Sequence, residues 1–230
     1  MAKAIRIIEI IGEGKLDIGE VKESDKHRPG PPTSGVVPIL VHKLCSQHHS
    51  LKVIRRRVSS LEKGGINRKV AFAKKQAFYN RSDGAVFVVD TEGDNPEKKR
   101  EQLIAGREAK YPDFPMAVGV AHPCIETWLL VDARAIVRGM NLQAAPVMHP
   151  DPESLPAPRK NESLNPKTVL AQCAGSTRGI SASEAAAIAS HINDLEAVGN
   201  ICRKGFRPFA EEVKARLAPL FEEPPLANEA

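Results

Sequence analysis

The feature that most constrains the fold is a continuous apolar run at residues 85–89, which ends at Asp90. Strands of a parallel sheet have this composition when helices cover both faces, because neither face then meets water. Short apolar runs at 5–11 and 116–121 predict two more strands. Residues 51–58 predict a fourth, and their three consecutive arginines favour a position at the edge of the sheet.

Segments with the periodicity of amphipathic helices lie between these runs. One of them begins near Pro96, and proline is well tolerated in a first helical turn because its missing N–H is not needed there. The predicted helices cover about residues 34–44, 67–80, 96–109 and 125–138. This alternation of strands and helices predicts an α/β fold with a doubly wound, mostly parallel sheet.

The composition changes after the last of these helices. Residues 143–163 contain five prolines and few apolar residues, which is typical of a loop or linker. Beyond it the pattern is helical, and Ser181 with Glu184 forms the capping-box pattern of a helix start. We therefore expect an α/β domain at 1–142, a proline-rich linker loop at 143–163 and a helical C-terminal extension at 164–230.

Acidic residues follow two of the predicted strands. Glu13 comes after the first, and Asp90, Glu92 and Asp94 come after the run at 85–89. Ligands of open parallel sheets bind beyond the carboxyl ends of the strands. Carboxylates crowded there repel one another unless a cation neutralises them, and oxygen ligands suit Mg²⁺ or Mn²⁺. The alternative for Asp94 is that it caps the helix that follows.

Basic residues are concentrated in one segment. The whole chain has 33 Lys and Arg against 28 Asp and Glu, whereas residues 41–89 have eleven bases and two acids, a balance of +9. Such a segment favours contact with nucleic-acid phosphates, and a solvated face is the alternative. Only 4% of residues are aromatic, which favours backbone contact over base stacking. The candidate contacts are Arg55, Arg56, Arg57 and, on the outward face of the helix expected at 67–80, Arg68, Lys69, Lys74 and Lys75.

Two further candidates lie near the start of the helix expected at 125–138. His122 and Glu126 are four residues apart, so they can meet on one helical turn beside the strand ends. Glu126 could bind substrate or steady a metal ligand, and His122 could contact a phosphate. The alternative is that Glu126 only complements the helix N-terminus, while Trp128 fills the core.

Three motifs together resemble a known family. Glu13-Gly14 follows the first predicted strand, Val89-Asp90-Thr91-Glu92 ends the run at 85–89, and residues 121–132 read Ala-His-Pro-Cys-Ile-Glu-Thr-Trp-Leu-Leu-Val-Asp. They resemble the Toprim domain, and the third is similar to a block in uncharacterised bacterial Toprim-like proteins related to phage-defence nucleases. Two departures are a glutamate, Glu92, where these domains usually have aspartate, and a loop of about twenty residues after Gly14.

The resemblance implies metal-dependent phosphoryl chemistry. Mg²⁺ or Mn²⁺ would be held by Glu13, Asp90 and either Glu92 or Asp94. Glu13 would be a further ligand or the general base, and Gly14, with His122 and Glu126, would lie next to the site. The function implied is a Mg²⁺-dependent nuclease, or a related phosphoryl-transfer protein, that acts on nucleic acid in mobile-element or phage defence.

Other functions remain open from the sequence. A non-catalytic Toprim scaffold would bind nucleic acid, a nucleotide or a protein partner in a defence system, and a small-molecule phosphatase is a third class. No apolar stretch is long enough to span a membrane, and no secretory signal is evident at the start of the chain. The four cysteines form no CxxC motif, so we expect reduced thiols in a cytoplasmic protein with no membrane partner.

Overall fold

The computed structural model describes residues 5–21, 28–45, 51–61, 63–109, 112–158 and 163–222. Four strands form a parallel sheet in this part of the chain, in the order β2-β1-β3-β4. Because β1 pairs with β2 on one side and with β3 on the other, the strand order reverses between β1 and β3. The strands are β1 (Arg6–Gly12), β2 (Leu51–Arg57), β3 (Gly84–Asp90) and β4 (Met116–Ala121). The prediction of an α/β fold with a parallel sheet is confirmed, and so is the edge position of β2.

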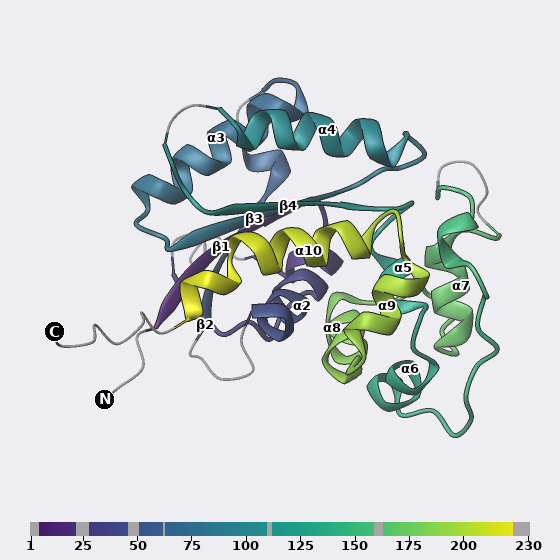
Figure 1. Cartoon of the computed structure of the whole chain (residues 1–230). Helices are drawn as coiled ribbons and strands as arrows, with labels where there is room; N and C mark the ends of the chain where they lie inside the picture. Colours follow the sequence, from purple (N-terminus) through teal and green to yellow (C-terminus); the bar gives the residue numbers. More distant parts are fainter. Residues whose placement is uncertain are drawn as a thin grey trace, which may run out of the picture.

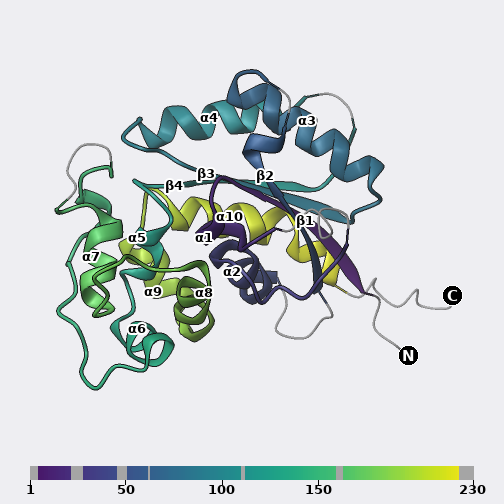
Figure 2. The same ribbon diagram turned by 180° about the vertical axis from the view of Figure 1, so that it is seen from behind.

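Helices cover both faces of the sheet (Figure 1). One face carries α3 (Ile66–Tyr79) and α4 (Pro96–Arg107), and the other carries α2 (Val36–Cys45) and α10 (Phe206–Arg216). Side chains alternate between the two faces of each strand, so neighbouring residues belong to different cores. In β3, Phe87 packs towards α3 and α4, whereas Val86 and Val88 pack into the core that includes α2 and α10. Figure 2 shows the same two layers from behind.

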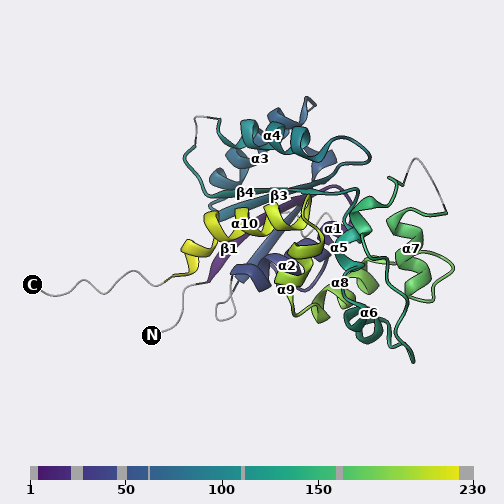
Figure 3. The same cartoon turned by 45° about the vertical axis from the view of Figure 1, so that its right-hand side comes forward.

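A group of shorter helices continues the chain from the carboxyl end of β4 (Figure 3). It comprises α5 (Glu126–Leu129), α6 (Ala133–Met140), α7 (Pro166–Cys173), α8 (Ala182–His191) and α9 (Leu195–Ile201). The short helix α1 (Lys15–Ile18) follows β1 directly and packs against α2 and α8. α1 and α5 therefore each follow the carboxyl end of a strand, where ligands of parallel sheets bind.

The helix expected at 125–138 is two helices, α5 and α6, so that prediction is wrong. Asp132 separates them, because its Oδ1 accepts hydrogen bonds from the N–H groups of Arg134 (2.9 Å) and Ala135 (3.0 Å). This N-cap starts a new helix at a new angle. The long loop expected after Gly14 contains α1, and residues 22–27 of it lie outside the described part of the chain.

The proline-rich segment packs against the rest of the molecule through residues 152–157. The carboxylate of Glu153 is buried and accepts hydrogen bonds from the backbone N–H groups of Lys204 (2.9 Å) and Gly205 (2.7 Å). Leu155 and Ala157 are also buried. Residues 159–162 lie outside the described part. Among the described helices, none has the length and apolar character needed to cross a bilayer.

Candidate active site at the carboxyl ends of the strands

The two strand ends that the sequence marks with acids are neighbours in the sheet. Glu13 follows β1 and Asp90 ends β3, at the point where the strand order reverses. Oε2 of Glu13 accepts a hydrogen bond of 3.0 Å from the backbone N–H of Asp90. The structure thus brings together the two acids on which the predicted site depends.

A third carboxylate, Asp17, lies beside them, and sequence reasoning missed it. Asp17 is on α1 and only 4% of its surface is exposed. Its Oδ2 accepts hydrogen bonds from the backbone N–H groups of Glu13 (2.9 Å) and Gly14 (2.8 Å). Asp17 therefore holds the turn that follows β1. The sequence signal that could have identified Asp17 was its position three residues after Gly14, at the start of a short helical turn.

Glu126 is the fourth carboxylate of the group, which we call the acidic cluster (Glu13, Asp17, Asp90 and Glu126). It starts α5 and is 4% exposed. Oε2 of Glu126 and Oδ1 of Asp90 are buried and have no hydrogen-bond partner. The other oxygen of Glu126 lies 3.9 Å from Nζ of Lys167. Buried polar atoms normally have a hydrogen-bond partner, so these two oxygens are candidate ligands for a bound ion or molecule.

Burial changes the proton affinity of all four carboxyls. Burial is the largest cause in each case and raises the pKa of Glu13, Asp17, Asp90 and Glu126. For Asp90 the pKa lies well above its ordinary value, because the charges of the other three carboxylates add to burial. Carboxylates in such surroundings either take up protons or bind a cation.

Glu92 and Asp94 lie at the rim, outside the buried part of the cluster. Both are exposed, and Glu92 has a left-handed backbone with φ of 51°. The carboxylate of Asp94 lies 3.5 Å from Nζ of Lys99, which also donates a hydrogen bond of 2.7 Å to the backbone carbonyl of Asp90. Asn95, and not Asp94, caps α4 through the N–H of Lys98 (2.9 Å). Of the two residues, Glu92 acts on the cluster, because its charge contributes to the raised pKa of Glu13.

The acidic cluster has only part of the ligand set of a divalent-cation site. Among the residues that the structure describes, no three His, Cys, Asp or Glu side chains are grouped tightly enough to form a complete metal site. The unpaired oxygens of Asp90 and Glu126 nevertheless have the chemistry that Mg²⁺ prefers, since this ion commonly takes one or two carboxylates and keeps several waters. The donor set therefore fits a hydrated cation held by two side chains.

His122 lies at the end of β4 and contacts the residue after Asp90. Its Nδ1 is 3.0 Å from Oγ1 of Thr91, and this hydroxyl donates a hydrogen bond of 3.2 Å to the backbone carbonyl of Pro123. Burial, with help from the nearby charge of Lys204, lowers the pKa of His122. His122 is thus neutral at pH 7 and positions Thr91. Trp128 belongs to the core, as expected, and stacks on a phenylalanine of α10.

Three of the predicted nucleic-acid contacts have structural partners. Arg56 forms an ion pair of 2.7 Å with the buried Glu9, and Arg55 donates to the backbone carbonyl of Ile18 (3.2 Å). Lys74 was expected on the outward face of its helix, and this is wrong. It is 5% exposed, and its ammonium donates to two backbone carbonyls at and beyond the end of α4 (2.7 and 2.8 Å).

The other four basic candidates reach the surface. Arg68 and Lys75 on α3 are exposed, and Arg57 and Lys69 are partly exposed. The ammonium of Lys75 lies 5.9 Å from the centre of the Tyr79 ring. We call Arg57, Arg68, Lys69 and Lys75 the basic surface. It lies on β2 and α3, the elements next to the β1 strand that leads to Glu13.

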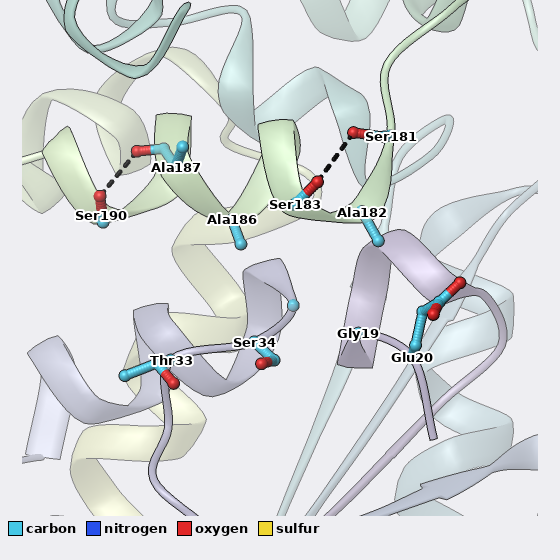
Figure 4. A pocket seen from close by; sticks show the side chains of 11 residues that line it. Gly19, Glu20, Thr33, Ser34, Ser181, Ala182, Ser183, Ala186, Ala187 and Ser190 are labelled. Carbon is cyan, nitrogen blue, oxygen red and sulfur yellow. Dashed lines mark hydrogen bonds between the residues drawn. The ribbon is translucent and has the colours of Figure 1, made fainter. Parts of the chain in front are cut away.

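A separate cavity of about 630 Å³ lies between α8, the segment after α1 and the segment before α2 (Figure 4). Small and hydroxyl-bearing side chains line it. Three serines in and next to α8 have local partners: Ser190 donates to the carbonyl of Ala187 (2.7 Å), and the hydroxyl oxygens of Ser181 and Ser183 lie 3.1 Å apart. The acidic residue of the cavity lining, Glu20, forms an ion pair with Lys15, in which Nζ of Lys15 lies 3.0 Å from Oε1 of Glu20.

Comparisons of the chain with protein-family models, with curated proteins and with solved structures gave no match. The likeness to Toprim domains therefore stays a prediction that depends on the three sequence motifs. The site described above depends only on the geometry of the chain itself.

Proposed function

We propose that the acidic cluster binds Mg²⁺ or Mn²⁺ and that the protein is a metal-dependent nuclease or a related phosphoryl-transfer protein. One observation carries this proposal: Asp90 and Glu126, two members of a group of four interacting carboxyls, each have a buried oxygen without a hydrogen-bond partner. The cluster lies where the strand order reverses, which is the usual ligand site of open α/β sheets.

The residues of the cluster have different roles in this proposal. Asp90 and Glu126 would hold the cation, and Asp17 fixes the turn that presents Glu13. Glu13 accepts a proton from the attacking water or hydroxyl, a role suited to a carboxylate whose pKa is raised towards neutrality. The bound cation would stabilise negative charge on the phosphate oxygens.

Nucleic acid is the proposed substrate because of the basic surface. Four basic side chains of β2 and α3 reach solvent beside the sheet, and their charges would neutralise phosphates without reading sequence. The resemblance to Toprim-like proteins of phage defence supports the same substrate class, and on the same ground we propose a role in mobile-element or phage defence.

Cleavage assays test this function. Single- and double-stranded DNA and RNA would be incubated with the protein and Mg²⁺ or Mn²⁺. Wild type would be compared with Asp90→Asn and Glu126→Gln, and with Glu211→Gln as a control on the exposed side of α10. We expect the first two variants to lose activity by about 100-fold or more and the control to keep it. Activity that survives both cluster substitutions would exclude the proposed site.

A second function is favoured by the absence of a complete three-residue metal group among the described residues. In this case the scaffold binds nucleic acid without turnover. Salt-sensitive binding by wild type, together with no cleavage under any metal condition, would establish it.

A further inference from the structure

Lys167 reaches the acidic cluster from the C-terminal helical segment. It lies in the first turn of α7, which Asn165 caps by accepting hydrogen bonds from the N–H groups of Lys167 (3.0 Å) and Thr168 (3.1 Å). α7 packs against α5, the helix that begins with Glu126. The cap and this packing fix the base of the lysine side chain next to the cluster.

The position of Lys167 on its helix is electrostatically unfavourable by itself. The N-terminus of a helix carries partial positive charge, so acids are preferred in the first turn, and α7 has none there. The acidic cluster compensates, because the ammonium interacts favourably with Glu126, Asp90 and Asp17. Lys167 in turn is a source of positive charge that opposes the raised pKa of each of these three carboxyls.

The ammonium of Lys167 is held loosely. Its distance of 3.9 Å from Glu126 is longer than a hydrogen bond, and its side chain is 55% exposed whereas that of Glu126 is 6% exposed. The lysine side chain is a flexible four-carbon stem that carries a point charge. The ammonium can therefore leave the carboxylate without breaking a hydrogen bond to it.

We propose that Lys167 is the tethered counter-ion of the acidic cluster. A divalent cation displaces the Lys167 ammonium from the cluster, and the displaced ammonium then binds a phosphate oxygen of the substrate. The two cations compete because both are attracted to the carboxylate of Glu126 and repel each other at short range. Once displaced, the ammonium remains at the mouth of the site, where a phosphodiester would approach. The competition rests on the metal binding in the proposed function, and the last step rests on its nucleic-acid substrate as well.

Mn²⁺ binding tests the competition. Full-length wild type, Lys167→Met and the control Lys214→Met, an exposed lysine of α10, would be titrated with Mn²⁺ and followed by electron paramagnetic resonance. We expect Lys167→Met to bind Mn²⁺ more tightly by at least about threefold, because a competing charge has been removed. Unchanged or weaker Mn²⁺ binding in a variant with a normal thermal unfolding transition would overturn the proposal.

Oligonucleotide binding tests the phosphate contact. A short single-stranded DNA would be titrated with each protein loaded with Ca²⁺, so that affinity is measured without turnover. We expect Lys167→Met to lower this affinity, Lys167→Arg to keep most of it, and Lys214→Met to keep all of it. Tighter Mn²⁺ binding without weaker DNA binding would overturn the phosphate contact. If wild type neither binds nor cleaves nucleic acid, the proposed function fails, and the Mn²⁺ titration still decides the competition.

Discussion

At the scale of the residue, Asp90 links burial to pH-dependent stability. Burial and three neighbouring carboxylates raise its pKa well above the ordinary value, so the folded protein keeps this proton to higher pH than the unfolded chain does. The stability that this carboxyl contributes is complete below its ordinary pKa and is lost as the pH rises through the raised pKa. Without a divalent cation, the cluster therefore lowers the free energy of unfolding at neutral and alkaline pH.

The first prediction is that Asp90→Asn unfolds at higher urea concentration than wild type at pH 8 in the presence of a chelator. We expect a gain of about 1 kcal/mol at pH 8 and a smaller one at pH 5, where the wild-type carboxyl is more protonated. Asp94→Asn, a change at the exposed rim, should show no such pH dependence. If wild type and Asp90→Asn lose stability in parallel from pH 5 to 8, the buried carboxyl is not the cause.

The sequence predicts part of this site because it marks the ends of neighbouring strands. The sequence alone predicts that Glu13 and Asp90 lie close together, since parallel strands end at one edge of the sheet. The sequence does not predict the place of Asp17 in the site, because its role depends on the backbone turn that it caps. The sequence does not predict the place of Lys167 either, because α7 reaches α5 only through tertiary packing.

At the scale of the element, a buried ion pair adds to the backbone pairing that holds the edge strand β2 against β1. Arg56 binds one oxygen of Glu9 on β1 (2.7 Å), and Asn80 after α3 donates to the other oxygen (2.9 Å). The side chain of Glu9 is fully buried. This network joins two strands and a helix, so the three arginines at the edge are not equivalent.

The second prediction compares two of these arginines. Arg56→Met should lower the free energy of unfolding by about 3 kcal/mol, because it leaves the Glu9 carboxylate buried without its charge partner. Arg57→Met should change it by no more than about 0.5 kcal/mol, as is usual for surface substitutions. Urea denaturation measures both. Equal stability of the two variants would show that the Arg56 pair does not hold the edge strand.

The order of the elements follows from the sequence, whereas one break between them does not. Each strand was predicted because its apolar run is short and bounded by polar residues, and the helix at 67–80 because its apolar residues recur on one face. The break between α5 and α6 was missed because apolar periodicity continues across it. Asp132 carries the signal, since its carboxylate caps α6.

At the scale of the whole molecule, the third prediction concerns the salt dependence of nucleic-acid binding. Each phosphate contact from the basic surface releases counterions, so affinity falls as salt rises. Arg68→Met and Lys75→Met should each reduce the slope of log K against log salt by about 1, whereas Lys214→Met should not. Fluorescence anisotropy at several salt concentrations measures the slope. Slopes that stay at the wild-type value would place the nucleic acid elsewhere.

The C-terminal segment and the sheet share one core, which limits how the chain can be divided. Gly119 of β4 lies against α10 so closely that a Cβ there would come within 2.5 Å of the Phe209 ring. Phe209 also stacks on Trp128 of α5, with ring centres 5.1 Å apart. α10 therefore completes a face of the sheet that residues 1–142 cover only in part, through α2.

The fourth prediction is that a fragment of residues 1–142 does not fold cooperatively. Without α10 the fragment exposes the apolar face of β3 and β4, and without α7 the acidic cluster loses its lysine. In the full chain, Phe209→Ala should cost about 3–5 kcal/mol, as expected for a large side chain removed from a core. Near-ultraviolet circular dichroism during urea unfolding checks both. A sharp, cooperative transition of the fragment would show that the first 142 residues are an independent domain, and that the helical segment supplies Lys167 to a site already formed.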